Sequence, residues 1–204
     1  MAAIKLHDIS AAEGEKVFES IKMGEWADGS AVGVPVHIVN GREAGPVVAV
    51  TAAIHGDEVV GTEVVRRITS ELDPARLRGA VVGIPIVNTP SFILNARTNV
   101  LEDYMGSNDA STILWTAQPN GSLSERIASL IREEIIPLSE VYIDLHSWAR
   151  GSTNYQRAII AGEFANMAPE LRRGCDGLGE ACGYEYVFKP RASRWSGMPA
   201  GLAG

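Results

Sequence analysis

The chain has 204 residues, which is enough for one domain with a sizeable core. Hydrophobic residues make up 46% of it and charged residues 21%, a balance that excludes an intrinsically disordered protein. The net charge of −7 argues against nucleic acid as a partner. The apolar runs are far shorter than the ~20 residues of a membrane span, and the start of the chain has no signal-peptide pattern. The sequence therefore predicts a cytoplasmic protein without membrane contact.

The first part of the chain predicts edge strands. Residues 1–16 are mixed and polar, and we expect them to wrap the edge of the domain. Strands are predicted at 17–26 and at 32–39, the second from alternating side chains, and turn-forming residues occupy 40–45. Residues 1–45 are therefore expected to be antiparallel edge strands of a single catalytic domain that spans 1–204.

A strand–helix unit follows. The Val- and Ala-rich run at 47–54 predicts a strand buried on both faces, and a helix is predicted over about 58–72. Residues 80–87 predict a second buried strand. Residues 91–121 lack periodicity, as expected of a long functional or mobile loop.

The last part of the chain continues the alternation. Ser122 and Glu125 form a capping-box pattern, which predicts a helix from about 123 to 136 that Pro137 ends. Further elements are expected in this order: a buried strand at 141–145, a strand near 157–161, a helix within 163–182 and a strand near 184–189. This alternation predicts an α/β fold with a mixed, largely parallel sheet and helices on both faces.

Polar side chains follow the buried strand at 47–54 directly. His55 and Glu58 are three residues apart, at the carboxyl end of a strand, where open α/β sheets bind their ligands. One imidazole and one carboxylate make half of a metal site. The pair alone also fits surface or helix-capping chemistry, so a metal site requires a third ligand.

The strand at 141–145 supplies that ligand. His146 follows it directly, and the carboxyl ends of parallel strands share one edge of a sheet. His55, Glu58 and His146 are therefore expected to converge, with an open position for water, as in a catalytic zinc site. Tyr142, Asp144 and His146 share one face of the strand. Asp144 is expected to orient a ligand or to bind a substrate group. His146 also fits a strand-end histidine with only local hydrogen bonds.

The HGDE segment at 55–58, read with its flanks from 52 to 61, and the DLHS segment at 144–147 resemble the succinylglutamate desuccinylase/aspartoacylase family. These proteins are amidohydrolases with a zinc-carboxypeptidase-like fold. The resemblance extends through IVN at 86–88, Arg97 and NGSLSERIA at 120–128, and covers residues 30–190. It implies one zinc ion per chain, held by His55, Glu58 and His146, and hydrolysis of a small N-acyl amino acid.

The resemblance also implies roles for other residues. Arg97 would polarise the scissile carbonyl or hold the oxyanion. Asp57, like Asp144, is expected to be a hydrogen-bond partner of the metal ligands, and Asn88 and Asn108 are candidates to bind substrate. The family motif Asp-Leu-Asn-Arg, whose arginine grips the substrate carboxylate, is replaced by ASTILW at 110–115. An acylaspartate or succinylglutamate is therefore not the expected substrate.

The general base is expected to be missing from the chain. The family uses a glutamate on a late strand, and no acidic residue follows Glu185. The sequence is therefore expected to be an amino-terminal portion, truncated before the base, that binds zinc but hydrolyses slowly or not at all. Glu180 and Glu185 are the substitute candidates.

Other interpretations stay open at this point. The chain also fits a zinc carboxypeptidase acting on peptides, a metal-binding but inactive fragment, or a metal-free sugar- or nucleotide-binding protein. The last has little support, because no Gly-rich phosphate loop follows either buried strand. Association into a homo-oligomer is left open. Cys175 and Cys182 are expected to be reduced thiols. Lys189, Arg191 and Arg194 are a solvated basic cluster or contacts for an anionic substrate.

Overall fold

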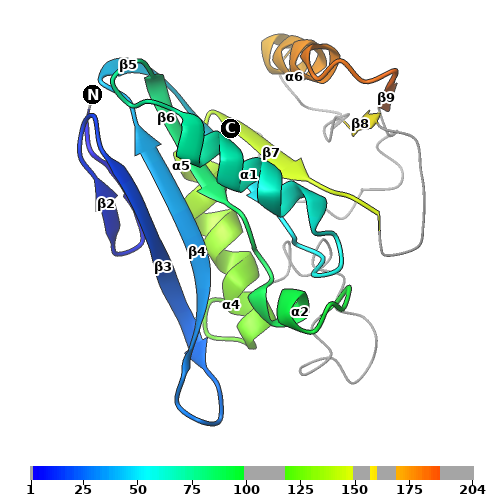
Figure 1. Cartoon of the computed structure of the whole chain (residues 1–204). Helices are drawn as coiled ribbons and strands as arrows, with labels where there is room; N and C mark the ends of the chain where they lie inside the picture. The colour runs from blue at the N-terminus through cyan, green and yellow to red at the C-terminus, as the bar shows by residue number, and fades with distance from the viewer. Residues whose placement is uncertain (1, 99–117, 149–156, 160–168, 189–204) are drawn as a thin grey trace. The chain divides into compact units, whose positions relative to one another are not determined.

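The computed structural model describes residues 2–98, 118–148, 157–159 and 169–188 (Figure 1). The chain divides into two compact units, Met1–Gly151 and Ser152–Gly204. Both units hold the predicted mixture of strands and helices. Whether they form the single domain expected from the sequence stays a prediction.

The first unit is built on one five-stranded mixed sheet. Its strands, in spatial order, are β3 (Lys16–Glu25), β4 (Ala31–Asn40), β6 (Arg78–Ile84), β5 (Glu43–Ala52) and β7 (Val141–Leu145). The pairs β3–β4 and β4–β6 are antiparallel, whereas β5 is parallel to both β6 and β7. The predicted α/β fold with a mixed sheet is confirmed, and the predicted edge strands form its antiparallel part.

Helices cover both faces of this sheet, as predicted (Figure 1). Because side chains alternate along a strand, neighbouring residues of β5 enter different cores. Ala49 packs in the cluster that contains Ile127 of α4 (Leu123–Leu130), whereas Val50 packs in the cluster that contains Val65 of α1 (Val60–Glu71). The central strand of the site is thus buried from both sides.

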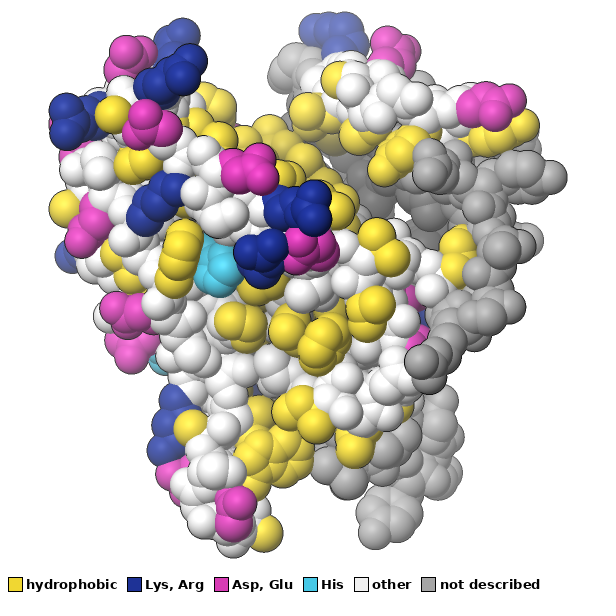
Figure 2. Space-filling model, in the orientation of Figure 1, with side chains coloured by type: hydrophobic (Ala, Val, Ile, Leu, Met, Phe, Trp, Pro, Cys, Tyr) yellow, Lys and Arg dark blue, Asp and Glu magenta, His cyan; other side chains and the backbone are white. Residues whose placement is uncertain are grey.

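Helix α1 presents its outer face to solvent. Val60, Val64 and Ile68 recur at helical spacing on this exposed face, with Glu63 ion-paired to Arg66 among them. Figure 2, in the orientation of Figure 1, shows hydrophobic and charged side chains mixed on this side of the molecule. Within the described residues, no helix is long and apolar enough to cross a membrane.

Residues 1–16 are more ordered than the expected edge-wrapping segment. Within them, β1 (Ile4–Leu6) and β2 (Ile9–Ala11) pair as an antiparallel hairpin. Their alternate side chains are buried and belong to the main core: Ile4, Leu6, Ile9 and Ala11. His7 lies between the two strands with φ of 55° and bonds Glu134 at 3.1 Å. The period-two pattern of this segment was too short to stand out among its polar residues.

Two predicted boundaries around the central strands were also wrong. The stretch 40–45 is not all turn, because β5 already begins at Glu43, which pairs with Arg78 across an irregularity before Val47. The strand predicted at 80–87 ends as β6 at Ile84. The next residues still bond the end of β5, since the Val87 and Asn88 amides donate to the Ala52 and Ala53 carbonyls at 2.9 and 3.0 Å.

The predicted helix from 123 is present but is not a continuous α-helix. Ser122 and Glu125 form the expected capping box. Beyond α4 comes one π-helical turn, η1 (Ile131–Ile135), in which the Ile136 amide bonds the Ile131 carbonyl, and then α5 (Ile136–Leu138). Pro137 does not end the helical segment. Because its nitrogen carries no proton, it cannot donate back into the helix, which fits the wider turn that precedes it.

The buried side of that turn makes the first testable prediction. Ile135 is fully buried in the core against the sheet. We expect Ile135→Ala to lower the free energy of unfolding by about 2–5 kcal/mol, through lost burial and a residual cavity. Urea unfolding would measure this. Ile93→Ala is the matched control, because that side chain is 68% exposed and its loss should be nearly neutral. An equal effect of both substitutions would contradict the packing.

The second unit contains the late elements. Helix α6 (Pro169–Ala181) lies between β8 (Arg157–Ile159) and β9 (Tyr186–Phe188) in the chain, and the two short strands pair in parallel. These match the predicted strand near 157–161, helix within 163–182 and strand near 184–189. Cys175 and Cys182 are free, as expected. In the predicted long loop, α2 (Thr89–Ile93) extends into its start, while 99–117 lie outside the described residues.

Candidate metal centre

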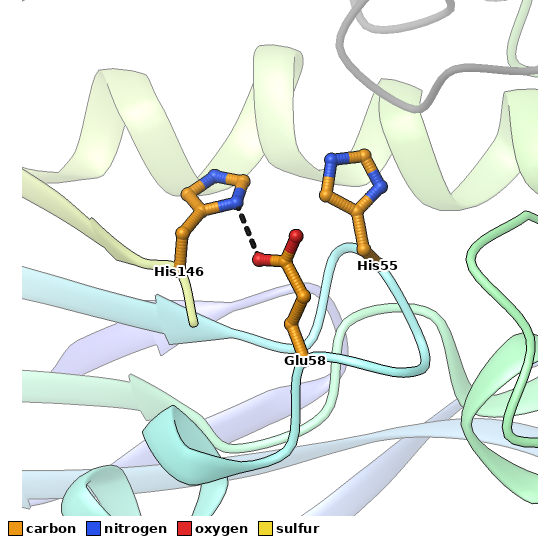
Figure 3. A group of neighbouring side chains, drawn as sticks. All are labelled: His55, Glu58 and His146. Carbon is orange, nitrogen blue, oxygen red and sulfur yellow. Dashed lines mark hydrogen bonds and ion pairs between the residues drawn. The ribbon is translucent and has the colours of Figure 1, made fainter. Parts of the chain in front are cut away.

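The sheet brings the two polar segments to one edge. Strands β5 and β7 run in parallel with Thr51 opposite Asp144 and Ala52 opposite Leu145, so both strands end at the same level. His55 and Glu58 lie in the loop that follows β5, and His146 follows β7 directly. Figure 3 shows the Glu58 carboxylate pointing toward the space between the two imidazole rings.

The three side chains are close enough to share one metal ion. One ligand atom from each of His55, Glu58 and His146 lies within 4.8 Å of the others, and the two imidazole centroids are 5.3 Å apart. His55 and Glu58 are almost fully buried, at 3% and 5% exposure, while His146 is exposed. The group thus has a buried floor and one open side.

The loop after β5 is held in an uncommon backbone shape. Ala53 has a φ of 52°, in the left-handed region that residues with a Cβ seldom adopt. The side chain of Asn88 holds this loop through hydrogen bonds. Its Nδ2 donates to the Ile54 carbonyl at 3.3 Å, and its Oδ1 accepts from the Ser91 amide as the N-cap of α2. Asn88 is buried, and both of these hydrogen bonds join its side chain to the backbone.

Gly56 is the point at which this loop presses on α2. A Cβ at this position would lie 2.1 Å from the Ser91 carbonyl carbon and 2.3 Å from the Phe92 nitrogen. Both are backbone atoms, which cannot rotate away as a flexible side chain does. The glycine between His55 and Glu58 is therefore required by this close approach.

Glu58 is the centre of the hydrogen-bond network. Its Oε1 accepts from Arg97 Nη1 at 2.8 Å, and its Oε2 lies 2.8 Å from His146 Nδ1 and accepts from the Ser147 amide at 3.1 Å. Burial alone would raise the pKa of Glu58, but the hydrogen bonds from His146 and Arg97 hold that pKa below its usual value. The carboxylate is thus kept in the charged form that binds a metal.

His146 is held between two carboxylates. Its Nε2 lies 2.9 Å from Asp144 Oδ2, opposite the contact of its Nδ1 with Glu58. These bonds, to Asp144 first and then Glu58, raise the pKa of His146 to about 10. The pocket therefore strongly favours positive charge. Two imidazoles and one carboxylate with an open side are the ligand set of catalytic zinc, so the residues present fit that ion.

Arg97 lies at this site as well. Its Nη1 pairs with Glu58, and its Nη2 lies 3.1 Å from His55 Nε2. The side chain remains half-exposed. The guanidinium is thus next to the candidate ligands and open to a molecule approaching from solvent.

The other predicted residues are placed differently. Asp57 has one buried carboxylate oxygen without a hydrogen-bond partner among the described residues. Asn108, Lys189, Arg191 and Arg194 lie outside the described residues. Glu180 and Glu185 belong to the second unit and are exposed. For these residues, a part in the site stays a prediction.

Sequence reasoning missed three groups of the site. They are the Ser147 amide on Glu58, the Thr51 hydroxyl on Asp144 at 2.7 Å, and the Tyr142 hydroxyl on Thr51 at 2.9 Å. Two of them left a signal. Thr51 is the one polar side chain in the Val- and Ala-rich run of 47–54, and Tyr142 shares a strand face with Asp144. A backbone amide leaves none.

Two comparisons of the sequence find similar proteins. A sequence model of the succinylglutamate desuccinylase/aspartoacylase catalytic domain matches residues 44–191. The N-alpha-acetyl-L-2,4-diaminobutyric acid deacetylase of Halomonas elongata is 33% identical over 158 residues, which are 78% of this chain and 44% of that protein. The chain thus spans less than half the length of this curated relative.

Two solved structures share the fold. A succinylglutamate desuccinylase/aspartoacylase from Rhodobacter sphaeroides superposes with a TM-score of 0.75 at 20% identity, over 94% of this chain and 58% of that one. The product-bound ectoine utilization protein EutE (DoeB) from Ruegeria pomeroyi gives 0.67 at 20% identity, over 86% and 52%. The similarity extends to the arrangement of sheet and helices.

Proposed function

The chain belongs to the succinylglutamate desuccinylase/aspartoacylase family, and from that premise we propose that it cleaves the amide bond of a small N-acyl amino acid in a zinc-dependent reaction. The observation that carries the proposal is the convergence of His55, Glu58 and His146 at the shared edge of two parallel strands. A zinc ion held by these three residues would activate a water molecule and polarise the amide carbonyl.

The surrounding side chains have separate parts in this proposal. Asp144 accepts the Nε2 proton of His146, which leaves Nδ1 as the ligand atom on the side of Glu58. Arg97 presents a half-exposed cation beside Glu58 and His55, suited to stabilising negative charge that develops on the carbonyl oxygen. Binding of substrate by Asn88 and Asn108 is the least supported part of the proposal, since Asn88 is buried in structural contacts.

The substrate proposed is an N-acetylated diamino acid. The support is the name of the curated relative, a deacetylase of N-alpha-acetyl-L-2,4-diaminobutyric acid. The missing Asp-Leu-Asn-Arg motif argues against acylaspartate and succinylglutamate. No residue in the described part of the site is assigned the role of general base, so the predicted hydrolysis is slow.

The direct test is a hydrolysis assay on the 204-residue chain loaded with zinc. Acetate release from N-acetyl-L-2,4-diaminobutyrate is compared with release from N-acetylaspartate and with cleavage of a dipeptide. Chelator-sensitive hydrolysis of an acyl amino acid, above the rate of free zinc, is expected. Preferential cleavage of the dipeptide would favour a carboxypeptidase instead. A chain that binds no zinc and shows no chelator-sensitive hydrolysis of any of the three would contradict the proposal.

Arg97 gives a second prediction. Arg97→Ala is expected to lower the rate constant for hydrolysis by about 100–1,000-fold, as does loss of one group that stabilises an oxyanion, while zinc remains bound. Activity and zinc content are measured on the same preparation. Arg66→Ala is the matched control, because that arginine also pairs with a glutamate, Glu63 at 2.6 Å, but on the exposed face of α1. Unchanged hydrolysis by the Arg97 variant would exclude this role.

A further inference from the structure

Thr51 is a buried polar residue in an otherwise apolar strand. It lies in β5, is 0% exposed, and is flanked on both sides by strands of the same sheet. A hydroxyl in such a place destabilises the fold unless it is hydrogen-bonded. The Thr51 hydroxyl has two close partners, Asp144 Oδ1 at 2.7 Å and Tyr142 Oη at 2.9 Å. Both partners lie on β7, opposite Thr51 and Ala49 in the parallel register.

The directions of these bonds follow from the number of protons. The Asp144 carboxylate can only accept, so the single Thr51 proton is donated to Oδ1. The Tyr142 hydroxyl must then donate to Thr51 Oγ1. Burial and the nearby charge of Asp144 raise the pKa of Tyr142, so this hydroxyl keeps its proton. The chain of donors therefore runs one way, from Tyr142 through Thr51 to Asp144.

The other oxygen of Asp144 continues the network to the metal site. Oδ2 lies 2.9 Å from His146 Nε2, which holds the proton on that nitrogen and turns Nδ1 toward Glu58 Oε2 at 2.8 Å. His146 is itself exposed at the end of β7 and has little packing to fix its ring. Its orientation therefore depends on its two carboxylate partners, Glu58 and Asp144, and the position of Asp144 depends on the groups that hold Oδ1.

We propose that Thr51 and Tyr142 are positioning residues, a clamp that fixes Asp144 and, through it, the ring orientation of His146. The clamp acts on a metal ligand, so the inference rests on the proposed function. It goes beyond it by assigning a task to two residues that are not expected to touch metal or substrate. Stabilisation of the fold alone is the competing explanation, because Thr51 is in the core.

The test compares Thr51→Val, which removes the hydroxyl at constant shape, with Thr51→Ser, which keeps it. Thr69→Val is the matched control, since Thr69 is also buried and hydrogen-bonded, but to Val65 and His37 away from the site. Zinc affinity is measured by competition with a chelator. We expect Thr51→Val and Tyr142→Phe to weaken it about 10-fold, the lower end of the range for loss of a ligand's direct partner, because both residues act on His146 only through Asp144. Thr51→Ser and Thr69→Val should stay near the wild-type value.

Two further measurements separate the explanations. In the double variant Thr51→Val/Asp144→Asn, the losses in zinc affinity should be less than additive, because both residues act through one path. In the metal-free protein, NMR should show a His146 Nε2 proton that exchanges slowly in the wild type and in Thr51→Ser, and rapidly in Thr51→Val. This signal does not depend on zinc, so it tests the clamp even if the metal assignment fails.

The outcomes are distinct. If the wild type binds zinc and Thr51→Val binds it equally well, the clamp is wrong and the proposed function stands. Equal losses of affinity in Thr51→Val and Thr69→Val would also overturn the clamp, because they would show a general loss of stability. If the wild type binds no zinc, the proposed function is wrong. The clamp then survives only as a device that orients His146, supported by the protected Nε2 proton and overturned by its rapid exchange.

Discussion

Replacing His146 with alanine is expected to weaken zinc binding by more than the ~100-fold that follows loss of an outer partner of a ligand. His146 is one of three candidate ligands, and its removal leaves one imidazole and one carboxylate. Its side chain is exposed and follows the end of β7, so the substitution removes little packing. Zinc content after dialysis and affinity by chelator competition measure the effect.

His7→Ala is the control for this substitution. His7 is also an exposed histidine with a carboxylate at hydrogen-bond distance, Glu134 at 3.1 Å, but it lies in the amino-terminal hairpin. Its loss should leave zinc affinity unchanged. If both His146→Ala and His7→Ala kept the zinc content of the wild type, His146 would not be a zinc ligand and the proposed metal centre would be wrong.

Gly56→Ala is expected to have the second large effect. The new methyl group would lie 2.1 and 2.3 Å from backbone atoms of Ser91 and Phe92, so the loop or α2 must shift. Overpacking of this kind costs about 1–3 kcal/mol, and here the strain falls between His55 and Glu58. We therefore expect both a lower free energy of unfolding and weaker zinc binding from this single methyl group.

Gly174→Ala provides the comparison. Gly174 lies in α6, and a Cβ there meets no atom within 4 Å. Alanine in a helix is favoured over glycine by about 0.5–1 kcal/mol, so this variant should be neutral or slightly more stable. Urea unfolding and chelator competition on both variants decide the matter. A Gly56→Ala protein with wild-type stability and zinc affinity would show that the close approach to α2 is not real.

The sequence was most informative where polar residues interrupt apolar runs. The runs at 47–54 and 141–145 predicted buried strands, and each is followed directly by a histidine. Because parallel strands bring their carboxyl ends to one edge, His55 and His146 were expected at the same edge, and the pairing of β5 with β7 makes them neighbours there. The fold class followed from the same alternation of strands and helices.

Features that depend on long-range pairing were not accessible in this way. β5 begins at Glu43, where it pairs with Arg78 of β6, and no local sequence pattern predicts this pairing. The hairpin at 4–11 forms because its alternate side chains enter a core made by distant segments. The π-helical turn before Pro137 requires knowing that the helix continues beyond that proline.

The hydrogen bonds around the site show the same division. Residue types at strand ends predicted which side chains gather, but not how they share protons. Two of these hydrogen bonds depend on the register in which β5 and β7 pair. One joins the Ser147 amide to Glu58, and the other joins the Thr51 hydroxyl to Asp144. Zinc itself, the task of Arg97 and the location of the base stay predictions.

The central claim is that one zinc ion binds between His55, Glu58 and His146. Anomalous diffraction at the zinc absorption edge, from crystals of the zinc-loaded 204-residue chain, tests it most directly. We predict a single strong peak within bonding distance of all three side chains, about 2.0–2.2 Å from their nitrogen and oxygen ligand atoms. A peak bound elsewhere, or none at this edge of the sheet, would contradict the account.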